Sequence, residues 1–241
     1  MKIIWVLLKG DLKNIRRDAI LILAFFAPLL LILVTNLALP VVRELVNNQF
    51  SYDISVHYPF FSAFLLLLIP LLLGALSGFL ILEEKESGLL MFFSVTPLTR
   101  KGYFYYRIFL PYFLGALFSF FVSYFSNLVT IPLWFLSPLV LIAALEAPMI
   151  TLFLGTFATN RVEGLAFSKG LGVLFAAPVA GYLVDSNWHF AAGFTPPYWV
   201  TQGFLAAYNS QNIFFLYLAG GIFVHLAFLK FLIKKYLDSV D

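Results

Sequence analysis

The chain has 241 residues, of which 62% are hydrophobic and 11% are charged. Soluble domains average about 45–50% apolar and about 25% charged residues, so this composition excludes an ordinary soluble protein. The formal charge is +3, but the basic residues lie beside apolar stretches, where membrane topology and lipid headgroups account for them. We therefore expect no nucleic-acid partner. The absence of cysteine excludes disulfides and thiolate metal sites.

The first 18 residues mix apolar side chains with five basic ones, a pattern that is too polar to span a bilayer. It predicts a helix that lies in the membrane interface on the cytoplasmic side. A cleavable signal peptide would have its apolar core within about the first 20 residues. Residues 9–18 are charged instead, so we expect the N-terminus to be retained.

Apolar stretches of about 20 residues, the length that crosses a bilayer, recur along the chain. They predict six membrane spans, at residues 19–39, 61–82, 103–129, 136–158, 165–184 and 213–233. In the second span, Pro70, Gly74 and Gly78 predict a kink and close helix packing, because small residues let backbones approach. The segments between the spans are too short for a soluble domain. We therefore expect one all-α membrane domain over residues 1–241.

Two segments on the external side interrupt the spans. Residues 40–60 are polar and are expected to form a loop. Residues 185–210 are too long for a simple turn and predict a re-entrant or interfacial helix before the last span. In that helix Pro196 and Pro197 suit the first turn, and Thr195 suits the cap position.

Basic residues indicate the topology. Fourteen of the 15 Lys and Arg residues fall on one side of the predicted spans, and Arg43 alone falls on the other. Because basic residues concentrate on the cytoplasmic side, both termini and residues 83–102 are expected to face the cytoplasm.

Residues 83–102 are the long polar interruption on this side. Acidic residues end the second span, an apolar stretch of two short helical turns follows, and Pro97 stops it because the residue before a proline avoids the α region. Gly88 permits the turn into this short helix. We interpret the segment as a docking element, with Leu89, Leu90 and Phe93 as the apolar side chains that would fill a cleft on a partner. The alternative is an ordinary charged loop between two helices.

The order of Glu83-x-x-Glu86-x-Gly88, an apolar helix and then Thr-Pro-Leu-Thr-Arg100 resembles the permeases of ABC-2 type exporters. In that family this loop is a coupling helix that inserts into a separate ATPase subunit. The resemblance extends over the whole chain, and it departs from the family at residues 91–93. It implies ATPase contacts at Glu84, Glu86, Gly88, Leu89, Leu90, Pro97 and Arg100.

The resemblance also implies the assembly and its location. The chain has no Gly-rich phosphate-binding loop, so ATP and Mg²⁺ are expected on a partner ATPase, with no cofactor and no metal on this chain. A second permease, identical or related, would complete the pathway. The location implied is the cytoplasmic membrane of a prokaryote. Residues 160–166, with Lys169 and Gly170, further resemble the inner loop of drug or fluoroquinolone-type exporters.

Two ionisable residues lie deep in predicted spans. Glu146 is near the middle of the fourth span, where a charge costs about 2.5–3.5 kcal/mol on insertion scales and needs a partner, a proton or water. It is either a polar group on the permeation path, such as a proton-sensitive gate, or a structural hydrogen-bonding group. His225, in the sixth span, is the nearest candidate partner and the second candidate for the permeation path, as a ligand or proton relay. The alternative is a packed, hydrogen-bonded histidine. Arg107, Lys169 and Lys230 are expected to snorkel to the inner face.

Other polar and aromatic groups carry weaker hypotheses. The third span is rich in aromatic residues, which either line a path for planar drugs or pack against lipid and helices. The polar residues of the two external segments follow no metal-ligand spacing: Asp53, His57, Asp185 and His189.

The function expected is therefore that of a permease subunit of an ATP-driven exporter, which moves a hydrophobic or amphipathic compound outward. A non-transporting membrane scaffold or immunity protein is the alternative. An intramembrane enzyme is disfavoured, since it would need a convergent set of polar groups at bilayer depth.

Overall fold

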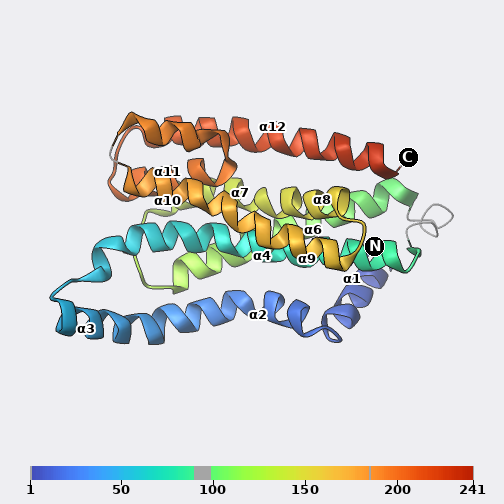
Figure 1. Cartoon of the computed structure of the whole chain (residues 1–241), viewed down its shortest axis with the longest axis horizontal. Coiled ribbons are helices and arrows are strands. Elements are labelled where there is room, and N and C mark those ends of the chain that lie inside the picture. Colours follow the sequence, from blue (N-terminus) through green and yellow to red (C-terminus); the bar gives the residue numbers. More distant parts are fainter. Residues whose placement is uncertain (1, 90–98, 185, 241) are drawn as a thin grey trace.

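A computed structural model describes residues 2–89, 99–184 and 186–240, and in these ranges every regular element is helical (Figure 1). Within them, six helical stretches are long and apolar enough to cross a membrane: Ala19–Phe50, Ile54–Glu86, Lys101–Phe125, Leu133–Phe157, Arg161–Leu183 and Phe214–Asp238. The expected all-α architecture with six spans is confirmed. The two ends of the described chain lie at the same end of the bundle, as an even number of spans requires (Figure 1).

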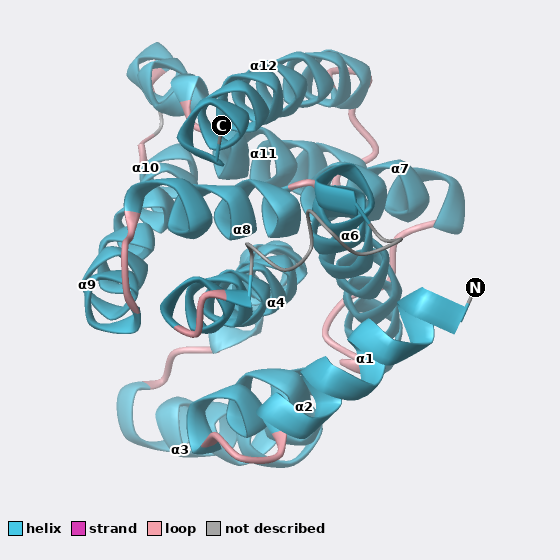
Figure 2. Ribbon diagram, turned by 90° about the vertical axis from the view of Figure 1, so that its right-hand side faces the viewer, coloured by secondary structure: helices cyan, strands magenta, loops and turns pink. Residues whose placement is uncertain are grey.

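Three helices form the centre of the bundle: α4 (Tyr58–Glu86), α7 (Leu133–Ala144) and α8 (Glu146–Phe157). Figure 2 shows α4 enclosed by its neighbours. The surrounding helices expose apolar side chains, as lipid-facing helices do: α2 (Ala19–Leu33), α6 (Thr99–Phe125), α9 (Arg161–Leu171), α10 (Ala176–Leu183) and α12 (Phe214–Val240). Before them, α1 (Lys2–Ile15) lies at an angle to the bundle axis and exposes Trp5 and Leu12 (Figure 1).

Glycine allows α4 and α8 to pack closely. A Cβ at Gly74 would lie 2.5 Å from the Ala147 carbonyl oxygen, and one at Gly78 would lie 2.7 Å from a methyl carbon of Leu154. The Thr151 hydroxyl donates a hydrogen bond to the Gly74 carbonyl at 3.1 Å, which links a side chain of α8 to the backbone of α4. The close packing predicted from the two glycines is confirmed.

The first span is longer than expected, and the prediction of a loop over residues 40–60 is wrong. Helix α2 continues through a π-helical turn, η1 (Val34–Ala38), into α3 (Leu39–Phe50). Pro40 lacks an amide proton and its ring would clash with the carbonyl four residues back, and the wider π-turn accommodates it. A 32-residue helix is about 48 Å long, so this first span is longer than the roughly 30 Å of hydrocarbon that it has to cross.

Prolines also break the fourth and fifth spans. Leu145 separates α7 from α8, three residues before Pro148, whose ring opposes the carbonyl of Ala144. A 3₁₀ turn, η3 (Gly172–Phe175), similarly separates α9 from α10, which contains Pro178. Both spans are therefore interrupted in their interiors.

Helix α11 (Pro196–Tyr208) follows a 3₁₀ segment, η4 (Asn187–Phe194), and is the helix expected before the last span. It packs against α4, α7, α10 and α12, and most of its side chains are buried. Pro196 and Pro197 occupy its first turn as predicted. Thr195 is at the cap position, but its hydroxyl donates to the Ala192 carbonyl at 2.8 Å and makes no capping bond.

Candidate functional site

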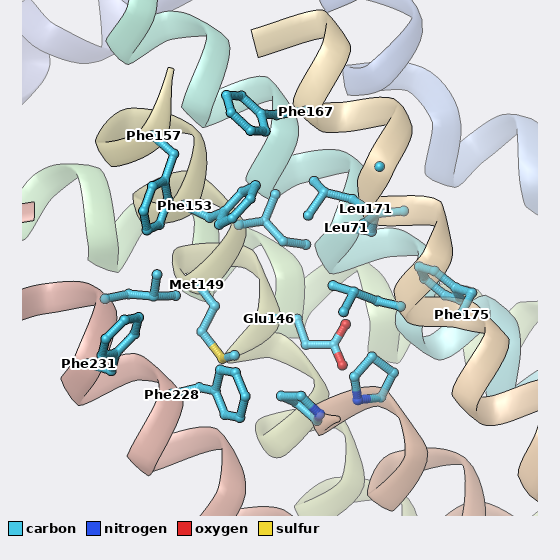
Figure 3. A pocket seen from close by; sticks show the side chains of 16 residues that line it. Leu71, Glu146, Met149, Phe153, Phe157, Phe167, Leu171, Phe175, Phe228 and Phe231 are labelled. Carbon is cyan, nitrogen blue, oxygen red and sulfur yellow. The ribbon is translucent and has the colours of Figure 1, made fainter. Parts of the chain in front are cut away.

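A cavity of about 420 Å³ lies between α8, α9, η3 and α12. This volume is within the range of about 300–1,000 Å³ that is typical of small-molecule sites. Pro196 and Pro197, at the start of α11, also contribute to its wall. Six aromatic side chains line it (Figure 3): Phe153, Phe157, Phe167, Phe175, Phe228 and Phe231. The cavity is therefore apolar and rich in aromatic rings.

Glu146 is the one ionisable residue among the described residues that line this cavity. It is the first residue of α8, directly after the break at Leu145, and only 4% of it is exposed. Figure 3 shows its carboxyl group between Met149, Phe228 and Phe175. The helix break thus places a carboxyl group in the wall of an apolar cavity.

His225 of α12 lies behind this carboxyl group. Its Nε2 is 3.6 Å from Glu146 Oε1, and it is fully buried. Its Nδ1 lies 2.7 Å from the Gly221 carbonyl oxygen. Within the described chain, Nε2 and Oε1 have no hydrogen-bond partner at normal distance. The structure therefore brings together the two residues that we had identified in separate spans.

A buried ionic cluster lies at the end of the bundle where the chain termini are found. Arg107 of α6 is 2% exposed and donates two hydrogen bonds to Asp11 of α1, at 3.0 and 2.9 Å. It also forms a salt bridge to Glu84, which accepts a hydrogen bond from Tyr103. The Tyr106 hydroxyl donates to Asp11 at 2.6 Å. The expectation that Arg107 snorkels is wrong, because it is enclosed by two carboxylates.

The residues on either side of Glu84 in the sequence bond to other helices at the same end of the bundle. Arg161, at the start of α9, bridges Glu83 at 2.7 Å and Asp18, the N-cap residue of α2, at 3.2 Å. Glu86 accepts a hydrogen bond from the Arg161 amide at 2.7 Å. Lys85 donates to the Gly155 carbonyl in the last turn of α8. We call residues 83–86 the junction, because they bond α4 directly to α6, α8 and α9, and through Arg107 and Arg161 to α1 and α2.

Two of the residues expected to contact an ATPase belong to the junction. Glu84 is buried and bonded to Arg107 and Tyr103 of α6, and the Glu86 carboxylate is bonded to α9, so both have partners within the chain. Gly88 follows with a left-handed φ of 70°, consistent with the turn predicted there, and Leu89 is exposed. The other positions fall outside the described residues, wholly or in their side chains: Leu90, Phe93, Pro97 and Arg100.

The aromatic residues of the third span do not line the cavity. Phe120, Phe121 and Tyr124 of α6 are exposed on the outside of the bundle. Helix α6 ends at Phe125, earlier than expected, and Asn127 just after it adopts a positive φ of 52°.

The external polar residues have partners of other kinds. Asp53 is paired with Arg43 at 2.7 Å, and hydrogen bonding from this arginine and from the Ser55 amide lowers the pKa of the Asp53 carboxyl below its usual value. His57 is bonded to the hydroxyl groups of Tyr52 and Tyr182, each at 2.5 Å.

His189 lies 2.6 Å from the Tyr198 hydroxyl, and Asp185 is outside the described residues. In the part of the chain that the structure describes, these external groups do not converge on one site.

Sequence reasoning missed the cluster around Arg107. One signal was available: Asp11 is the single acid in a basic amphipathic helix. An isolated acid in such a helix indicates a specific partner for its carboxyl group. Its partner could not be identified, because α1 and α6 are separated by 96 positions between Asp11 and Arg107.

Comparison with known proteins identifies the family. Residues 11–233 match the family described as "Fluoroquinolones export permease protein Rv2686c-like". Two proteins of Mycobacterium tuberculosis, the fluoroquinolones export permease protein Rv2686c of strain H37Rv and its counterpart MT2760 of strain CDC 1551, are each 29% identical over 231 residues. The alignment covers 95% of this chain and 91% of each relative. No solved structure matches the chain. With six spans and a match over nearly its whole length, the chain belongs to the Rv2686c-like family of export permeases.

Proposed function

We propose that this chain is the membrane-spanning subunit of an ATP-driven exporter and that its substrate binds in the cavity between α8, α9 and α12. The observation that carries the proposal is an apolar cavity of small-molecule size, between the helices of a membrane bundle and open on one side, with one buried carboxyl group in its wall. Its relatives are named for fluoroquinolone export, and fluoroquinolones are fused aromatic compounds. An aromatic, amphipathic substrate of this kind suits a wall of phenylalanine rings.

The energy would come from a separate ATPase subunit, which binds ATP and Mg²⁺ and docks on residues 83–102 in the cytoplasm. The bonds made by the junction support this proposal. A force applied below α4 is passed to α9 through Arg161 and to α8 through Lys85, and both helices form walls of the cavity. A second permease, identical or related, would complete the transport pathway.

Filling the cavity tests the proposal. Gly170 lines it, and a Cβ at this position would meet nothing within 4 Å, so Gly170→Leu adds bulk at the cavity wall without a clash at its Cβ. Gly172 is equally unobstructed but does not line the cavity, which makes Gly172→Leu a matched control. Efflux of a fluoroquinolone from cells that also produce the ATPase should fall several-fold in the first variant and be retained in the second.

Two further measurements make this comparison specific. The amount of each variant in the membrane should be equal, and each should copurify with the ATPase to the same extent, because both glycines lie away from residues 83–102. Equal efflux by the two variants would show that the substrate does not pass through this cavity.

A further inference from the structure

Glu146 and His225 form a buried pair in which one polar atom of each side chain lacks a hydrogen-bond partner within the described residues. Glu146 Oε1 and His225 Nε2 face each other at 3.6 Å, with 4% and 0% of their residues exposed. Among the described residues, these two atoms have no partner at hydrogen-bond distance. Buried polar atoms are normally bonded, so a facing pair without partners points to an exchangeable occupant.

The number of protons on the pair follows from the other side of the imidazole ring. The Gly221 carbonyl can only accept a hydrogen bond, so Nδ1 of His225 carries a proton and donates it. In a neutral His225, Nε2 is then a bare acceptor. Facing an ionised Glu146, it would leave two acceptors opposed and one negative charge uncompensated in apolar surroundings. A single proton, on either Oε1 or Nε2, makes the pair neutral.

Other charges on the described helices around α8 do not reach this pair. Lys85 and Arg107 are bound in and beside the junction, at the other end of α8. Lys169 and Lys230 are exposed and do not line the cavity. The Tyr198 hydroxyl of α11 is bonded to His189. The charge that balances Glu146 must therefore be a proton or an ion that enters the cavity.

We propose that the Glu146–His225 pair is an exchangeable cation site: one proton occupies the pair when the cavity is empty, and an aromatic compound with one positive charge replaces it. In the bound state the Glu146 carboxylate faces the cation, His225 is neutral with its Nδ1–H on Gly221, and the displaced proton passes to water. The pair and its occupant are neutral together in both states. Aromatic rings in the wall, such as Phe228 and Phe153, favour the cation further.

This inference rests on the proposed function and adds the charge of the substrate and its exchange for a proton. It is tested on the full chain in lipid nanodiscs with two fluorescent naphthalenes of the same shape, one bearing a trimethylammonium group and the other a tert-butyl group. Because one proton is exchanged, the affinity for the cationic probe should rise about tenfold per pH unit wherever the pair is protonated. One proton should be released per cationic probe bound, and the neutral probe should bind independently of pH.

Variants locate the exchange. Glu146→Gln keeps the shape of the side chain but removes its charge, so it should abolish proton release and reduce binding of the cationic probe to that of the neutral one. His225→Asn keeps the carboxylate and should retain cation binding while shifting the pH range of the exchange. Glu44→Gln, which removes an exposed carboxyl group on α3, is the control and should bind both probes normally.

The two proposals fail in different ways. Cation binding that is independent of pH, or unaffected by Glu146→Gln, would overturn the exchange while leaving the cavity as a binding site. Binding of the neutral probe but not of the cationic one would also overturn the exchange and leave the cavity as a binding site. Binding of neither probe, together with equal efflux by the Gly170→Leu and Gly172→Leu variants, would remove the cavity itself from the function.

Discussion

Arg107 shows how a charge is accommodated inside this apolar bundle. Its guanidinium group is shared between Asp11 and Glu84, and all three residues are buried. The cluster thus holds two carboxyl groups for one guanidinium group. Removing the arginine leaves these two carboxyl groups without a counter-charge in a region of low dielectric constant.

We predict that Arg107→Met lowers the free energy of unfolding by about 3–5 kcal/mol, the usual cost of breaking a buried ion pair. Thermal unfolding in detergent measures this change. Arg43→Met, at the exposed pair with Asp53, is the matched control and should change the melting temperature little. Adding Asp11→Asn and Glu84→Gln to Arg107→Met should restore much of the stability. If the two arginine variants melt alike, the cluster is not a determinant of stability.

The sequence indicated only part of this chemistry at the level of single residues. Glu146 and His225 were recognised because each interrupts an apolar span and such residues require an explanation. Arg107 was misread because a base near the end of a span looks the same whether it points to lipid headgroups or to a carboxylate. The difference depends on the direction of α1, which hydrophobic periodicity does not encode.

The contact between α4 and α8 leaves no room for a side chain at Gly74. At Gly74 a Cβ would be 2.5 Å from the Ala147 carbonyl oxygen, a separation that requires one backbone to move. Gly115 of α6 faces the same residue from the other side, but a Cβ there would be 3.6 Å from the Ala147 side chain, an ordinary contact.

Gly74→Ala should therefore destabilise the protein by about 1–3 kcal/mol, the usual cost of overpacking. Gly115→Ala should be neutral or slightly stabilising, since alanine is the better helix former. Unfolding of the two variants in the same detergent provides the comparison. A neutral Gly74→Ala would mean that α4 and α8 are less tightly packed than these distances indicate.

Helix boundaries could be anticipated less well than helix positions. The apolar stretches located all six spans, but three departures occur at prolines: a π-turn before Pro40, a break before Pro148 and a 3₁₀ turn before Pro178. A proline in an apolar segment predicts a disturbance of the helix. Whether the helix bends, widens or stops depends on the packing around it, which a single sequence does not reveal.

The topology of the whole molecule is still a prediction from the distribution of its basic residues. The even number of spans places both chain ends on one side, and the fourteen-to-one division of bases assigns that side to the cytoplasm.

Single cysteines in this cysteine-free chain provide the test. Val56, in the 3₁₀ segment η2 (Ile54–His57), is exposed at the end of the bundle opposite to Leu89, which is also exposed. A membrane-impermeant maleimide should label Val56→Cys in intact cells and Leu89→Cys only after permeabilisation. The reverse pattern would invert the topology, and with it the side on which an ATPase could dock.

Because Asp11 points inward, the exposed charged side chains of α1 are all basic. With its single acid bound to Arg107, this helix and the residues just after it present Lys9, Lys13, Arg16 and Arg17 to their surroundings. Near an anionic bilayer surface, each such base contributes about 1 kcal/mol of attraction. The lipids that gather beside α1 should therefore be enriched in anionic phospholipids, and the stability of the purified protein should depend on the phospholipid composition in which it is kept.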